Sequence, residues 1–182
     1  MKHRLFWNAV LSIGLAVIGS GCQKRKAKLD PMPTLSRNPM DFLRKGFASF
    51  PPFFSLGRVQ GLIQQNKLKE ASRYVNECIN IEPRNASLHL LNGFIYESLL
   101  EGGQEDCREM VDIAYRTAMD LDPSLWLTHY LRGLTALKMS KYASAQKYFA
   151  DAHALSPKNP EITYALAYAS YYAYDLPVAL AF

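Results

Sequence analysis

Cysteine is scarce in this chain, with three residues in 182, so a fold held together by a disulfide framework is excluded. Charged residues make up only 20% of the sequence and apolar residues 49%, which favours a packed core over general disorder. The sequence also lacks a P-loop, a GxGxxG motif, a nucleophile elbow, a CxxC pair and a Ser-His-Asp pattern. We therefore expect a protein that is not an enzyme and that holds no cofactor and no metal.

The formal net charge of +5 is unevenly distributed along the chain. Residues 1–21 carry two basic side chains and no acidic one, and residues 22–57 carry seven basic and two acidic. Residues 58–182 therefore carry a net charge of −2. Because a nucleic-acid-binding domain needs positive charge on its folded surface, we expect no nucleic-acid partner.

The first 21 residues have the layout of a secretory signal. Lys2 and Arg4 precede an almost wholly apolar run over residues 5–18, and small residues at 19–21 lead to Cys22. The apolar run is shorter than the ~18 residues that a membrane span requires. The sequence therefore predicts a signal peptide over residues 1–21, and an uncleaved amino-terminal anchor is the alternative.

Residues 18–22, Ile-Gly-Ser-Gly-Cys, resemble the lipoprotein box of exported bacterial proteins. In that family, small residues precede a Cys whose thiol receives a diacylglycerol. The resemblance implies that Cys22 is lipidated and anchors the chain in a membrane. Gln23 in the next position implies an outer-membrane lipoprotein that faces the periplasm. Ordinary cleavage after Gly21, which would release a soluble periplasmic protein, is the alternative.

Residues 22–45 have the composition of a linker, because a basic run over residues 23–28 is followed by Pro31, Pro33 and Pro39. This pattern predicts an extended tether, either solvated or in contact with anionic lipid headgroups. Five of the nine phenylalanines then fall between residues 42 and 54. That density of apolar surface predicts either packing on the first helices or docking on a partner.

Residues 46–182 contain an internal repeat. Pro83, Pro123 and Pro157 each close a helical stretch, and the last two are 34 residues apart. The spacing resembles that of the tetratricopeptide repeat. The resemblance implies an all-α, right-handed superhelix (an α-solenoid) of about three and a half helix-turn-helix units. The expected units cover residues 52–85, 86–125, 126–159 and, incompletely, 160–182.

The third unit fits the repeat best. Gly133 falls where the family has a small residue in the first helix, and Phe149 falls where it has an aromatic residue in the second. A small residue lets two antiparallel helices approach closely, and the ring fills the gap between them. The second unit keeps Gly93 and Tyr115 at the same places and carries about six extra residues around 101–107.

The same resemblance implies a concave groove lined by the first helix of each unit. The lining positions carry apolar residues and tyrosines, which suit an extended peptide or a partner's helix. Packing of these rings against the next repeat is the alternative. The stripe lacks the Lys and Asn with which chaperone-binding members clamp a carboxylate. The predicted groove residues are Leu90, Phe94, Tyr130, Leu134, Tyr164, Tyr168 and Tyr171.

Four further residues have the chemistry of metal ligands or disulfides. His89 and His129 occupy equivalent places in successive units, where the resemblance implies core packing rather than metal ligation. Cys78 and Cys107 remain once Cys22 is assigned to lipid, and both pairing and separate thiols stay open.

These features predict a protein-protein interaction scaffold at the bacterial cell envelope. Its layout is similar to that of small repeat lipoproteins that assist pilus or secretin assembly. The alternative is an amino-terminal repeat module of a larger envelope enzyme or secretion-pore protein, because the fourth unit stops at Phe182 without the polar capping helix that solenoids use. The same uncapped edge permits oligomerisation.

Overall fold

The computed structural model describes residues 32–33 and 39–173, with side chains described from residue 43 onward in the second range. The described residues all belong to one compact unit. The predicted signal peptide over residues 1–21 and the predicted lipidation site Cys22 lie outside them. Within this part of the chain, no helix is long and apolar enough to cross a membrane.

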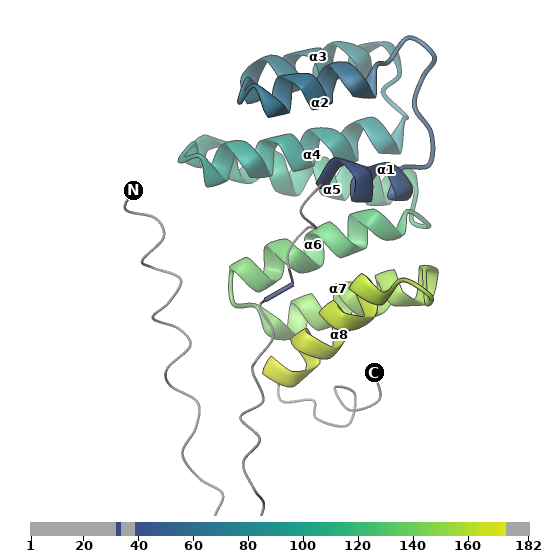
Figure 1. Ribbon diagram of the computed structural model, residues 1–182, viewed down its shortest axis with the longest axis vertical. Helices are drawn as coiled ribbons and strands as arrows, with labels where there is room; N and C mark the ends of the chain where they lie inside the picture. Colours follow the sequence, from purple (N-terminus) through teal and green to yellow (C-terminus); the bar gives the residue numbers. More distant parts are fainter. Residues whose placement is uncertain (1–31, 34–38, 174–182) are drawn as a thin grey trace, which may run out of the picture. The chain divides into compact units, whose positions relative to one another are not determined.

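Every regular element of the described residues is a helix, which confirms the prediction of an all-α solenoid fold. From α2 to α8 the helices follow one another in pairs, and Figure 1 shows these stacked in chain order, whereas α1 packs on α6 and not ahead of α2. Along the chain, the helices of the described residues are α1 (Pro39–Gly46), α2 (Leu56–Gln64), α3 (Leu68–Ile81), α4 (Ala86–Glu101), the short 3-10 helix η2 (Glu105–Cys107), α5 (Arg108–Leu121), α6 (Trp126–Lys138), α7 (Tyr142–Leu155) and α8 (Pro160–Tyr172).

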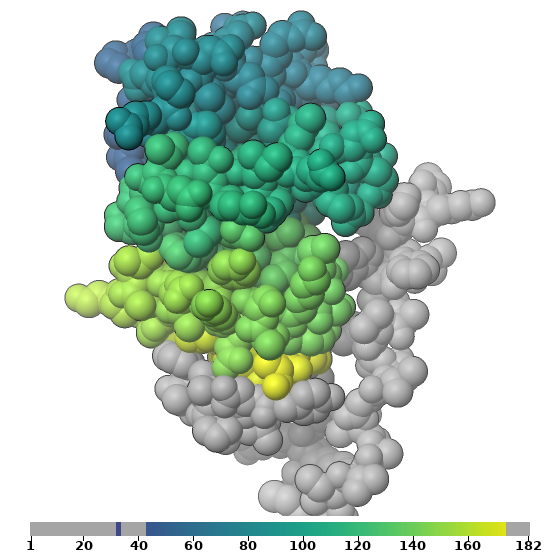
Figure 2. All heavy atoms as spheres, turned by 180° about the vertical axis from the view of Figure 1, so that it is seen from behind, coloured from purple at the N-terminus to yellow at the C-terminus, as the bar shows by residue number. Residues whose placement is uncertain are grey.

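Each pair of helices lies within one of the predicted units. Helices α2 and α3 form the first unit, α4 and α5 the second, α6 and α7 the third, and α8 is the first helix of the fourth. The two helices of each complete pair pack on one another, and α3 on α4, α5 on α6 and α7 on α8 join successive units. Figure 2 shows the same succession from behind, from the blue first unit to the yellow α8.

The close contact inside a unit depends on one glycine and one aromatic ring, as predicted. A Cβ atom built on Gly93 would lie 2.6 Å from ring atoms of Tyr115, and one built on Gly133 would lie 2.6 Å from Cδ1 of Phe149. Both rings are almost fully buried. The absence of a side chain at each glycine therefore lets the second helix seat its ring against the backbone of the first.

The ends of the helices have identifiable causes. Helices α2, α4 and α8 each begin after a residue whose side-chain oxygen accepts a backbone N–H of the first turn: Ser55, Asn85 and Asn159. The turns within the first and third units place Asn66 and Ser140 at positive φ, 59° and 57°. A left-handed residue reverses the chain there, and Asn tolerates that conformation better than Ser.

The described end of the segment before the repeats, residues 39–45, differs from the extended tether that composition predicts over residues 22–45. Pro39–Gly46 forms helix α1, and Leu43 is fully buried. Met32 packs against the same core. The boundary expected at residue 46 therefore falls too late, because Leu43 and Met32 supply apolar surface that the repeat helices bury.

The phenylalanine-rich segment packs on the first unit, as one of the two hypotheses states. The Phe47 and Phe50 rings lie 4.7 Å apart between centroids, and the Phe50 and Phe54 rings 4.5 Å. Phe54 stacks on Tyr74 of α3 at 5.7 Å. Phe53 stays exposed. The rings form a ladder that fixes the chain as it enters α2.

Candidate functional site

The predicted groove residues divide into three groups by exposure. Tyr164 and Tyr171 are exposed, and Phe94 and Tyr168 are half-buried. The expectation of an open groove is wrong at the other three positions, because these side chains are buried in the core: Leu90, Tyr130 and Leu134.

The chain's own amino-terminal segment packs into the same core. Leu43 of α1 belongs to the same buried cluster as Leu90 and Tyr130. Helix α1 packs on α6, where the backbone of Gly46 comes so close to Leu127 that an added Cβ would lie 2.7 Å from its side chain. Helix α1 thus covers the part of the groove where the resemblance implied an external peptide.

Tyr130 shows the consequence for a single side chain. Its ring lies 5.6 Å from Phe149 and 6.4 Å from Trp126 between centroids. Burial, reinforced by the nearby Glu161 carboxylate, raises the pKa of its hydroxyl well above the usual value. Tyr130 is therefore a core residue rather than a contact for a partner.

The exposed end of the predicted groove carries a cluster of tyrosines on α8 and the start of α7, which we call the tyrosine surface. Tyr168 and Tyr172 have ring centroids 4.6 Å apart, and Tyr142 stacks on Tyr172 at 5.3 Å. Tyr171 meets Tyr172 edge-on at 5.3 Å, and Tyr164 lies 6.4 Å from Tyr168. The tyrosine surface therefore comprises Tyr142, Tyr164, Tyr168, Tyr171 and Tyr172.

The rings of the tyrosine surface hold one another in place but are only partly covered. Tyr171 exposes 52% of its surface and Tyr164 36%. Burial, together with the neighbouring Tyr172 hydroxyl, raises the pKa of Tyr168. A set of mutually packed rings with polar tips offers apolar area and hydrogen-bonding groups at low entropic cost to a binding partner.

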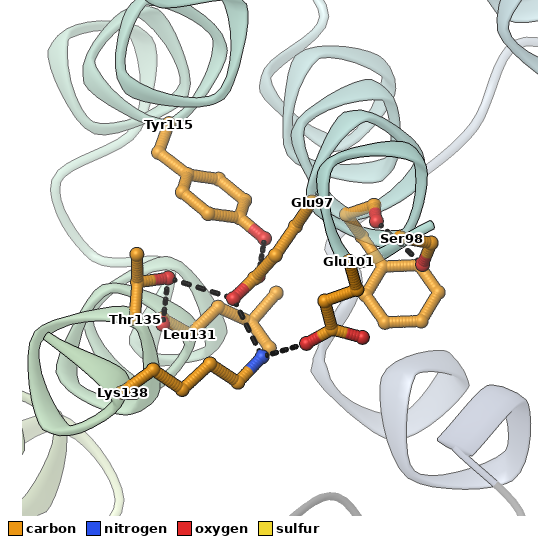
Figure 3. A network of polar contacts seen from close by, with 8 residues as sticks. Glu97, Ser98, Glu101, Tyr115, Leu131, Thr135 and Lys138 are labelled. Atoms are coloured by element: carbon orange, nitrogen blue, oxygen red, sulfur yellow. Dashed lines mark hydrogen bonds and ion pairs between the residues drawn. The ribbon is translucent and has the colours of Figure 1, made fainter. Parts of the chain in front are cut away.

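A second feature joins the second and third units through one buried carboxylate. Glu97 of α4 accepts hydrogen bonds from the Tyr115 hydroxyl at 2.8 Å, from Thr135 Oγ1 at 3.0 Å and from Lys138 Nζ at 2.8 Å. Lys138 also pairs with Glu101 at 2.5 Å. Figure 3 shows the Glu97 side chain pointing between Tyr115 on one side and Thr135 and Lys138 on the other.

A cavity of about 520 Å³ opens beside this network, among α4, α5, α6 and α7. Arg108, which follows the insertion in the second unit, forms part of its wall. Arg132 crosses the cavity wall to Asp112 at 3.0 Å and lies over the Tyr148 ring at 4.9 Å. Because these charges pair with one another, the arrangement joins two units and offers no concentrated charge to a ligand.

Neither Glu97 nor Lys138 is among the functional residues that the sequence predicts. The two residues are 41 positions apart, close to one repeat period plus the insertion. Opposite charges at neighbouring positions of successive units are the signal that predicts such a pair. The network therefore belongs to the contact between units, and no motif of the sequence pointed to it.

The two equivalent histidines have the structural role that the repeat resemblance implied. His89 Nε2 lies 2.8 Å from the carbonyl oxygen of Pro83, and His129 Nε2 lies 3.1 Å from that of Pro123. Each imidazole thus ties the first turn of one unit to the proline that closes the preceding unit.

The two cysteines of the repeat region are separate. Cys78 and Cys107 are both buried and both free. Burial raises the pKa of the Cys78 thiol, which favours the neutral, unreactive form.

Comparison with known proteins supports the fold and goes no further. Neither a protein-family model nor a curated protein matches the sequence. Three solved structures match with TM-scores of 0.55–0.57 and identities of 16–20%. They are a thermophilic TPR protein of Thermus thermophilus (TM-score 0.57, 20% identity, 68% of this chain and 66% of that one), pilF of Pseudomonas aeruginosa (0.56, 17%, 77% and 57%) and a tetratricopeptide repeat protein from Parabacteroides merdae (0.55, 16%, 79% and 49%).

These likenesses define the class of the fold. The chain is a tetratricopeptide-repeat-like α-solenoid, and it spans less than two thirds of the length of each of the three structures. At such low identity the similarity concerns the arrangement of helices and not the partners or activity of those proteins.

Proposed function

We propose that the protein is a non-enzymatic scaffold of the bacterial cell envelope that binds a protein partner through the tyrosine surface. The observation that carries this proposal is the gathering of Tyr164, Tyr168, Tyr171 and Tyr172 on α8 with two of the rings exposed. Clustered aromatic surface that a chain leaves exposed marks a binding site more often than a structural need.

The chemistry of the tyrosine surface favours a peptide or helix with apolar side chains. The rings supply flat apolar area and the hydroxyls supply hydrogen bonds at the edges. Tyrosines that become buried on binding are frequent hot spots of protein interfaces. Tyr164, Tyr168 and Tyr171 lie at positions that the repeat resemblance assigns to the partner-binding groove.

The envelope location rests on the amino-terminal sequence. The predicted signal peptide and the lipoprotein-box pattern ending at Cys22 support anchoring of the chain by lipid in the outer membrane. A role in pilus or secretion-complex assembly follows from the similar layout of small repeat lipoproteins. An amino-terminal module of a larger envelope protein remains the second hypothesis of the sequence.

The experiment is to measure partner binding after removing the exposed rings. The full chain, immobilised, captures envelope proteins that are identified by mass spectrometry, and the affinity of the captured partner is then measured. We expect the double variant Tyr164→Ala/Tyr171→Ala to bind that partner at least ~10-fold more weakly, because one aromatic hot spot is worth ~2 kcal/mol.

The matched control removes exposed apolar side chains elsewhere. Met110 and Ile113 of α5 are exposed at 47% and 59% and lie outside the tyrosine surface. The variant Met110→Ala/Ile113→Ala should keep full affinity. Equal affinity of both double variants, with unchanged helical circular dichroism, contradicts the proposed surface.

A further inference from the structure

The segment that precedes the repeats lies on them as a bound peptide would. We call residues 39–50 the strap. Leu43 of the strap is fully buried in the core formed with α4 and α6. The glycine at the end of α1, Gly46, sits so close to α6 that an added Cβ would lie 2.7 Å from Leu127 and 2.9 Å from Trp126. The apolar side of the strap is thus tightly seated.

Backbone groups of the strap fix its register on α4. The N–H groups of Ala48 and Ser49 both point to the Ser87 hydroxyl, at 3.2 and 3.4 Å. Ser87 is almost fully buried beneath the strap. A hydroxyl that accepts two consecutive backbone N–H groups holds the main chain rather than a particular side chain, as peptide-binding sites do.

The strap also carries a cation that acts on the first helix of the fourth unit. Burial raises the pKa of the Glu161 carboxyl, and the Lys45 ammonium of the strap opposes that shift through its charge. The strap contacts are therefore Ser87 on α4 and Leu127 on α6. These are the second residues of two successive units, so the strap crosses the two helices at the same level of the repeat.

We propose that the strap is the resident occupant of an exchangeable docking groove. The external occupant that fits is a short basic helix of a partner protein, with an aliphatic residue, a glycine three positions later and an aromatic residue next, like Leu43, Gly46 and Phe47. The basic residue before the glycine, like Lys45, has the charge opposite to that of Glu161 on α8. This inference goes beyond the proposed function, because the groove under the strap is distinct from the tyrosine surface.

The strap is built to be exchangeable. Helix α1 has eight residues, which is too short for a helix to persist without tertiary contacts, so it folds only where it is docked. Its attachment to the repeats through residues 51–55 keeps it at high local concentration. A partner segment therefore binds only to the fraction of molecules whose strap is released, and its apparent affinity falls by that fraction.

The test uses a fluorescent synthetic peptide of residues 39–50 added to the full chain. In Gly46→Leu, the new side chain has no room against Leu127 and unseats the strap. We expect the peptide to bind this variant at least ~10-fold more tightly than the parent chain. The matched control is Gly61→Leu, the same change in α2, where no atom lies within 4 Å of an added Cβ. It should bind the peptide as weakly as the parent.

Three further measurements keep the proposal open to refutation. Hydrogen exchange at residues 43–50 should rise in Gly46→Leu but not in Gly61→Leu. If Gly46→Leu does not fold, Leu43→Ala/Phe47→Ala serves as a second variant that releases the strap. A peptide with Lys45→Glu should bind several-fold more weakly. A variant whose strap is released but that does not bind the peptide overturns the proposal. The proposal is also overturned if light scattering shows that the parent chain forms dimers with exchanged straps, because a second copy of the chain is then the occupant.

Discussion

At the scale of the residue, Glu97 is the side chain that holds Tyr115, Thr135 and Lys138 together. Burial raises the pKa of the Tyr115 hydroxyl, and the Glu97 carboxylate raises it further. For Lys138, burial acts to lower the pKa, but Glu97 and Glu101 outweigh it and the pKa is raised. Both groups thus hold their proton more tightly in the folded state. Their contribution to stability is complete below pH ~10 and is lost as the pH rises through their folded pKa values.

We expect Glu97→Gln to lower the free energy of unfolding by ~1–3 kcal/mol at pH 7, because the amide removes the charge that holds Lys138 and turns an N–H₂ group towards donors. Urea unfolding followed by circular dichroism measures the loss. The control is Glu105→Gln, which alters an exposed ion pair with Arg108. The Glu105 side chain is 71% exposed, so this variant should change stability by less than ~0.5 kcal/mol.

Urea unfolding at high pH tests whether Glu97 raises the pKa values of Tyr115 and Lys138. Between pH 7 and pH 11 the parent chain should lose more stability than Glu97→Gln, so the difference between them narrows. A difference that stays constant, or a Glu97→Gln variant as stable as the parent at pH 7, contradicts the role of this network.

At the scale of the element, the contact between paired helices follows directly from local sequence. The places of Gly93 and Gly133 in the repeat pattern predict helix contacts, and each glycine does meet the ring of its own unit. Such contacts can be predicted because a repeat imposes the same packing at a fixed interval. The seating of a ring on a glycine is therefore a property that one unit of sequence determines.

We expect Gly133→Ala to destabilise the chain by ~1–3 kcal/mol, because its Cβ would overlap the buried Phe149 ring. Gly61→Ala is the matched control in the interior of α2, where the added methyl meets nothing within 4 Å. It should stabilise by ~0.5–1 kcal/mol, the usual preference of a helix for Ala over Gly. Thermal melts of the two variants should shift in opposite directions, and a Gly133→Ala melting temperature at or above the parent's contradicts the packing.

The strap shows where sequence reasoning stops. Residues 22–45 have the proline and charge of a linker, and only Leu43 and a few other apolar residues distinguish their end from a tether. The burial of Leu43 depends on α6, more than 80 residues later in the chain. No local pattern encodes such a contact. The family pattern also placed Leu90, Tyr130 and Leu134 on an open surface, although all three are buried in the core.

At the scale of the whole molecule, charge is segregated between a basic amino-terminal region and a repeat domain of opposite sign. Residues 22–57 carry five more basic than acidic side chains, whereas residues 58–182 carry a net charge of −2. An acidic domain is weakly repelled by anionic lipid, and a basic tether is attracted by ~1 kcal/mol per cation near the surface. Charge alone therefore gives salt-sensitive membrane binding, and lipid gives binding that resists salt.

The response of membrane binding to salt therefore distinguishes a lipid anchor at Cys22 from charge attraction by the basic tether. In cells fed labelled palmitate, we expect the parent chain to carry label and to leave the membrane only with detergent. Cys22→Ser should carry no label, because no other thiol follows the signal pattern at that place. Cys107→Ser is the matched control, the same change at a buried cysteine of the repeat domain, and should be labelled like the parent. Equal labelling of Cys22→Ser and the parent, or a parent released by salt alone, contradicts a lipid anchor at Cys22.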